Sequence, residues 1–235
     1  FGVLHLRLLV ATRRDGEARQ AAAAWRELAE HQQDEELVAL FDAAIKDPVG
    51  AILEATLAEL PEDDSAFLRA MPAALERPLP GYTLAPADAP PTGEIPAGAR
   101  VLLVTPPALE GFEREWRKVF PLAKPVGEDD EPPDAADPWS APAWRELLAE
   151  HPEGYDSLWV LDDLATAITQ YEFPDVVTWT RRYREAVLAR AKAITDQALA
   201  GRDAASLPWD CTENRSALRS LRRLVTIVPG TIVTT

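Results

Sequence analysis

The chain has 235 residues, of which 47% are hydrophobic and 27% charged, the composition of a folded protein with one or two domains. Its net charge of −15 would repel a phosphate backbone, so nucleic acid is not an expected partner. A single cysteine excludes an intramolecular disulfide framework, and the three histidines, at positions 5, 31 and 151, lack the spacing of a zinc site.

The sequence also predicts a cytoplasmic protein with no membrane association and no cofactor. No apolar run reaches the ~18 to 20 residues that cross a bilayer, and the start of the chain lacks the pattern of a signal peptide. Because the chain begins with Phe1 and not with Met, we expect it to be part of a larger polypeptide or assembly.

Amphipathic helices are predicted along the first part of the chain. Apolar residues recur at helical spacing over 3–13, 18–31, 37–45 and 52–60, and a short turn follows at 66–71. The first pair resembles one tetratricopeptide unit over about residues 6 to 31, through a glycine between the helices and an alanine-rich second helix. No recurrence follows at the ~34-residue period of such arrays, so no repeat array is predicted. Residues 1–76 are therefore expected to form a helical bundle.

Proline-rich sequence comes next and predicts a connector over 77–98. The β-branched run 100–105 interrupts it and is typical of a strand. A second strand is predicted within Tyr155 to Asp163, centred on Leu158 to Leu161. Helices at 109–120 and 141–151 separate the two runs, an order that allows the strands to pair in parallel.

The remaining segments complete the expected second domain, residues 99–235. The acidic stretch 127–138 predicts a mobile, solvated loop, because it has no large apolar side chain. A long helix is expected over 174–199, a basic helix over 213–224, and strands over 225–228 and 231–233. We therefore predict an α+β or α/β fold, with an N-terminal helical bundle followed by a three- to four-stranded sheet flanked by helices.

Asp162 and Asp163 are the candidate catalytic residues, because ligands of open α/β sheets gather where strands end. Two adjacent carboxylates could hold a divalent ion against a phosphate, with Thr105 at the end of the neighbouring strand. The alternative is that Asp163 only caps the following helix. The usual glycine-rich, nucleophile-elbow and His-Glu-x-x-His motifs are absent from the sequence.

A second group of residues points to protein binding. Residues 174–235 have a net charge of +4, so the rest of the chain carries −19. The last helix concentrates this basic charge in Arg215, Arg219, Arg222 and Arg223. Two loop tryptophans, Trp139 and Trp209, would mark an interface if they are exposed.

The expected function is a non-catalytic protein-interaction or regulatory module. Its expected partner is another protein, or a neighbouring domain of the same polypeptide that receives the arginine residues. The alternative is an α/β enzyme of phosphoryl transfer or hydrolysis, with a divalent ion at Asp162 and Asp163.

Overall fold

The computed structural model of the protein describes residues 1–87, 99–121, 138–170, 177–202 and 205–227. The chain divides into two compact units. Unit 1 comprises residues 1–71 and 172–183, and unit 2 comprises residues 72–171 and 184–235.

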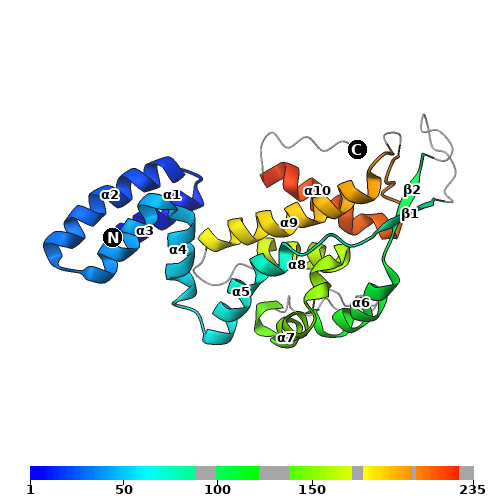
Figure 1. Ribbon diagram of the computed structural model, residues 1–235, viewed down its shortest axis with the longest axis horizontal. Helices are drawn as coiled ribbons and strands as arrows, with labels where there is room; N and C mark the ends of the chain where they lie inside the picture. The colour runs from blue at the N-terminus through cyan, green and yellow to red at the C-terminus, as the bar shows by residue number, and fades with distance from the viewer. Residues whose placement is uncertain (88–98, 122–137, 171–176, 203–204, 228–235) are drawn as a thin grey trace. The chain divides into compact units, whose positions relative to one another are not determined.

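Unit 1 is built from consecutive helices, of which α1 to α4 each pack against the next (Figure 1). Asp34 and Asp47 cap the third and fourth helices by accepting hydrogen bonds from the amides of Leu37 and Gly50. The helices are α1 (Gly2–Ala11), α2 (Asp15–Gln32), α3 (Glu35–Lys46), α4 (Pro48–Leu57) and the first part of α5 (Glu62–Leu75).

The core of unit 1 is formed where these helices meet. Small residues on α2, Ala18 and Ala22, are fully buried and allow the neighbouring helices to approach closely. Larger buried side chains come from α1, α3 and α4: Leu6, Val10, Phe41 and Ile52. The helices predicted over the first 60 residues are therefore confirmed.

Unit 2 is also mainly helical, and the predicted three- to four-stranded sheet is wrong. The described residues contain one sheet, in which β1 (Thr83–Pro86) and β2 (Val101–Val104) pair antiparallel. The strand predicted at 100–105 is confirmed as β2, but its partner lies in the segment expected to be a connector. The helices of unit 2 are α6 (Pro107–Val119), α7 (Ala143–Glu150), α8 (Leu158–Gln170), the later part of α9 (Val177–Leu199) and α10 (Thr212–Ile227). The ribbon lies at one end of this group of helices, and α10 packs against β2 (Figure 1).

The segment predicted as the central strand, Leu158 to Leu161, is the first turn of α8. The Ser157 hydroxyl accepts a hydrogen bond from the amide of Val160, and the Tyr82 hydroxyl accepts one from the amide of Leu158. These two hydroxyls bond amides that a helix start leaves without intrahelical partners. An apolar run this short fits a buried helix as well as a buried strand.

The C-terminal strands are corrected in a similar way. Residues 225–227 belong to α10, which ends at Ile227. The predicted strand 231–233 and residue 228 lie outside the described residues, as does the acidic loop up to residue 137.

An aromatic cluster and the buried Arg190 organise the core of unit 2. Trp116 of α6 is fully buried, stacked on Phe120 with ring centroids 4.5 Å apart, and meets Trp144 edge-on at 6.0 Å. Gly154 lies against this cluster, since a Cβ there would come within 2.3 Å of Phe112. Arg190 of α9 donates hydrogen bonds to four backbone carbonyls, those of Leu75, Arg77, Pro78 and Tyr155.

A side chain from α10 completes the ribbon. The Asn214 side chain accepts a hydrogen bond from the amide of Leu103 at 2.9 Å and donates one to the carbonyl of Val101 at 3.0 Å. Asn214 thus occupies the edge of β2 that does not pair with β1.

None of the helices in the described parts of the chain has the length and apolar character needed to span a bilayer.

Candidate functional site

Asp162, one of the predicted catalytic residues, is part of an internal ion-pair cluster. It lies on α8, and its side chain is only 3% exposed. Arg219 Nε lies 2.6 Å from Asp162 Oδ2, and Arg223 Nη1 lies 2.6 Å from Oδ1. Both carboxylate oxygens therefore face guanidinium groups of α10, which compensate the charge of this buried residue.

Asp163, the next residue, is bound by tryptophan and not by arginine. The indole nitrogen of Trp116 donates a hydrogen bond to Asp163 Oδ2 at 2.8 Å, and the Trp159 side chain lies nearby. Burial raises the pKa of Asp163 to about 7, although the two indoles act in the opposite direction. Asp163 lies within α8, so it does not cap the following helix, which was the alternative reading.

Thr105 belongs to a separate polar group at the start of α8. Burial raises the pKa of Tyr82 to about 12, and the side chains of Thr105 and Ser157 act in the opposite direction. Ser157 donates to Glu113 Oε1 at 2.7 Å, and burial raises the pKa of that carboxyl. Sequence reasoning did not single out Tyr82, Ser157 or Glu113, because they are far apart in the chain.

The structure therefore does not assemble the three residues of the enzyme alternative into one site. Thr105 lies near Tyr82 beside the start of α8, whereas Asp162 and Asp163 lie within that helix and bond Arg219, Arg223 and Trp116. Within the described residues, no group of three or more His, Cys, Asp or Glu side chains has a metal-binding arrangement.

The predicted interaction residues fall into two groups. Arg219 and Arg223 bind Asp162, so the body of unit 2 receives these two charges. Arg215 donates a hydrogen bond to the backbone carbonyl of Trp209, and Trp209 is 53% exposed. Arg222 is also exposed. Trp139 is buried and packs edge-on against Trp144, with ring centroids 5.2 Å apart.

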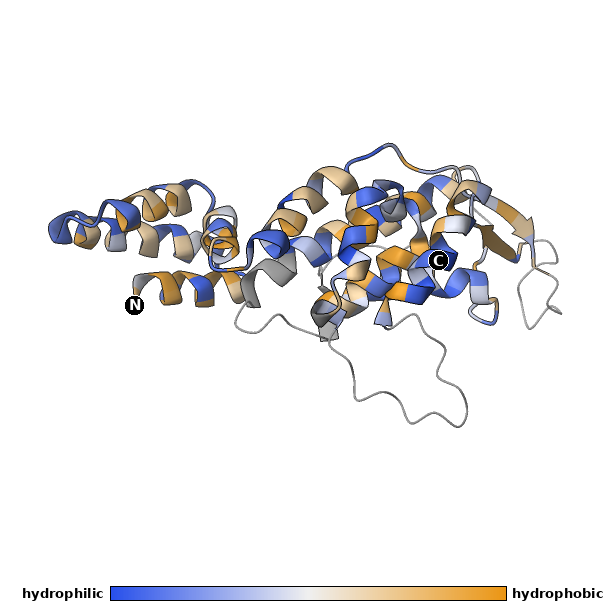
Figure 2. Ribbon diagram, turned by 90° about the horizontal axis from the view of Figure 1, so that it is seen from below, coloured by the Kyte–Doolittle hydropathy of each residue, from blue (hydrophilic) through white to orange (hydrophobic). Residues whose placement is uncertain are grey.

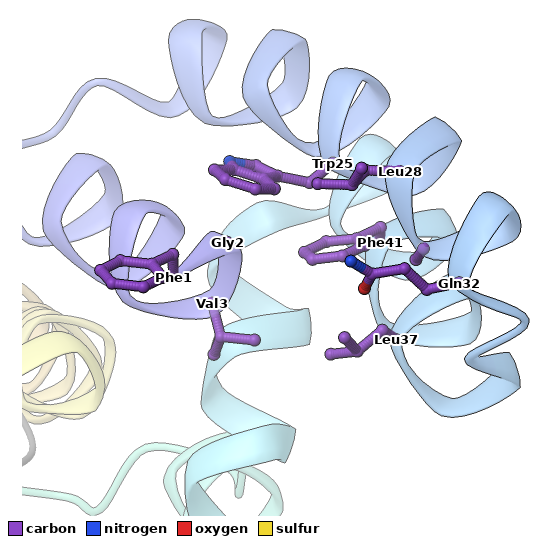
Figure 3. Close-up of a pocket in the computed structure, with 9 residues that line it drawn as sticks. Phe1, Gly2, Val3, Trp25, Leu28, Gln32, Leu37 and Phe41 are labelled. Carbon is purple, nitrogen blue, oxygen red and sulfur yellow. The ribbon is translucent and has the colours of Figure 1, made fainter.

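Unit 1 contains a cleft that sequence reasoning missed. It lies between the start of α1 and the hairpin formed by α2 and α3, and has a volume of about 380 Å³ (Figure 3). Its lining is apolar apart from one amide, that of Gln32. The lining residues are Phe1, Gly2, Val3, Trp25, Leu28, Ala29, Gln32, Leu37 and Phe41.

Gly2 brings α1 close to the aromatic side of this cleft. A Cβ at this position would lie 2.9 Å from Phe41 and 2.9 Å from Trp25, so any larger residue would push the start of α1 away. The Trp25 indole nitrogen also donates a hydrogen bond to His5 Nδ1 at 3.3 Å. The aromatic side of the cleft is thus held against α1.

Exposed apolar side chains continue from the cleft along α1. Leu28 at the cleft is 44% exposed, and Leu4 and Leu8 on α1 are 67% and 60% exposed. Figure 2 shows α1 largely in the colour of apolar residues, beside the N-terminus. Leu4 and Leu8 lie outside the apolar stripe of α1 that faces the core, and they are the sequence signal that could have revealed this surface.

Comparisons of the chain with protein-family models, with curated proteins and with solved structures found no match.

Proposed function

We propose that this protein is a non-catalytic protein-interaction module that acts within a larger assembly. The observation that carries the proposal is the apolar cleft of unit 1, with exposed Leu28 at its margin and exposed Leu4 and Leu8 on the adjoining helix. Clustered exposed apolar side chains on a folded domain mark surfaces that bind other proteins.

The arrangement in unit 2 supports the same proposal. The enzyme alternative needs a carboxylate whose oxygens can reach a divalent ion. Both oxygens of Asp162 bond arginines, and Asp163 bonds an indole. These contacts join α8 to α10 and to α6, which is a structural role.

A selection from a random-peptide library on the immobilised protein tests the proposal. We expect peptides that bind the wild-type chain and lose at least tenfold in affinity for Leu28→Gln. Leu79→Gln is the matched control, because Leu79 is 36% exposed in unit 2 and does not line the cleft. A selection that yields no peptide with this dependence would overturn the proposal.

A further inference from the structure

We infer that the cleft of unit 1 receives the apolar side of a basic, amphipathic helix from a partner protein. The inference rests on the proposed function and adds the chemistry of the partner. It follows from the shape and lining of the cleft together with the charge of the hairpin that forms two of its walls.

The hairpin is acidic. Residues 27–45 contain six acidic residues and no lysine or arginine. The acidic residues are Glu27, Glu30, Asp34, Glu35, Glu36 and Asp42. A partner segment with Lys or Arg beside its apolar residues would complement this charge.

Part of this acidic charge is compensated inside the unit and part is not. Arg26 bridges Glu30 at 2.9 Å and Asp42 at 2.5 Å. Glu27 and Glu36 are exposed, and in the described structure neither forms an ion pair. Each of them immediately precedes a lining residue of the cleft in the sequence: Glu27 precedes Leu28, and Glu36 precedes Leu37.

The walls of the cleft favour a helix as the occupant. All three walls are helices, so the cleft offers no strand edge to which an extended peptide could add. Trp25, Leu28, Leu37 and Phe41 project into the space between the walls (Figure 3). Such a surface takes apolar side chains spaced three or four residues apart along a helix.

The inference is tested with the full chain and three fluorescently labelled 18-residue probe peptides. The first contains Leu and Lys in an order that places all leucines on one side of a helix. The second has the same composition in scrambled order, and the third replaces every Lys by Glu. We expect the first peptide to bind at least tenfold more tightly than either of the others at moderate salt, as measured by fluorescence anisotropy.

Two pairs of variants assign the binding to the cleft. Leu28→Gln should weaken the binding of the first peptide at least tenfold, whereas Leu79→Gln, at an exposed leucine of unit 2 that does not line the cleft, should change the affinity less than twofold. The double variant Glu27→Lys with Glu36→Lys should lower the affinity for the first peptide more than the double variant Glu62→Lys with Asp63→Lys does. The second pair makes the same change of net charge on the exposed start of α5.

The outcomes separate the inference from the proposed function. The inference of a basic partner would be overturned if the Glu peptide bound as tightly as the Lys peptide or more tightly, or if the two charge reversals had equal effects. Library peptides whose binding depends on Leu28 would in that case still support the proposed interaction module. Equal binding of the scrambled peptide would reduce the interaction to charge alone and also overturn the inference. If neither the Lys peptide nor any library peptide depends on Leu28, both proposals fall.

Discussion

At the scale of single residues, adjacent carboxylates on α8 have opposite surroundings. Asp162 faces two guanidinium groups, and Asp163 faces the indoles of Trp116 and Trp159. Burial of Asp163 beside these neutral rings favours its protonated form. Asp163 therefore couples the packing of α6 on α8 to pH.

Replacing Asp163 by Asn should stabilise the protein in a pH-dependent way. The folded chain holds a proton on Asp163 up to about pH 7, and the unfolded chain releases it near pH 4, so this group lowers the stability progressively as pH rises from about 4 to 7. Asn keeps an oxygen for the Trp116 indole and does not titrate. Urea unfolding should show a small difference between variant and wild type at pH 4 and an advantage of a few kcal/mol at pH 8, at about 1.4 kcal/mol per pKa unit.

Two neighbouring charges also act on Asp163: Asp162 raises its pKa, and Arg219 lowers it. The variant should therefore change Asp163 alone and keep Asp162 and Arg219. A difference in stability that is the same at pH 4 and pH 8 would contradict the prediction.

Among the elements, β2 depends on α10 for its outer edge. Replacing Asn214 by Ala leaves the Leu103 amide and the Val101 carbonyl without this partner in a buried place. Each such loss costs about 1–3 kcal/mol, so we expect urea unfolding to show a destabilisation of roughly 2–4 kcal/mol. Arg222→Ala, on the exposed side of the same helix, should change the stability by less than ~0.5 kcal/mol.

Arg190 joins α9 to the other segments of unit 2. This residue is 5% exposed, bonds four carbonyls and pairs with Asp156. Arg190→Met should lower the free energy of unfolding by about 3–5 kcal/mol, because Asp156 and the carbonyls lose their shared donor.

Arg190→Lys distinguishes the geometry of the guanidinium from its charge. A single ammonium cannot direct donors to five acceptors in a plane, so the lysine variant should recover less than half of the loss. Full recovery by lysine, measured by urea unfolding, would show that charge alone matters.

How far the elements could be predicted depends on their exposure. The helices of unit 1 have one apolar side and capping aspartates, and both features are visible in the sequence. Helix α8 could not be recognised, because Leu158, Val160, Leu161 and Leu164 are all buried and no polar side reveals the period. The partner of β2 was missed because it is a four-residue strand within proline-rich sequence.

The candidate sites show the same limit. Sequence alone singled out Asp162 and the arginines of α10 as separate features, but the pairs are 57 and 61 residues apart, and only the fold brings them together. The cleft was missed because Trp25 and Leu37 fit a helix core as well as a surface.

For the whole molecule, each unit has its own buried residues. Asn214→Ala is therefore expected to act within unit 2 alone. Hydrogen exchange followed by mass spectrometry should show faster exchange in β2, α8 and α10 and unchanged exchange in α1 to α4. Comparable acceleration in α1 to α4 would show that the two units unfold as one cooperative body.

The Asn214 contact also affects how the molecule behaves in concentrated solution. A two-stranded ribbon with open edges can recruit strands from other molecules and start fibrils. One edge is occupied by Asn214 and, at its beginning, by the amide and carbonyl of Ser206, which bond Ala99 and Val101. The other strand ends in Pro86, which has no amide hydrogen to donate. The ribbon is therefore a poor template for aggregation, and loss of Asn214 would expose one of its edges.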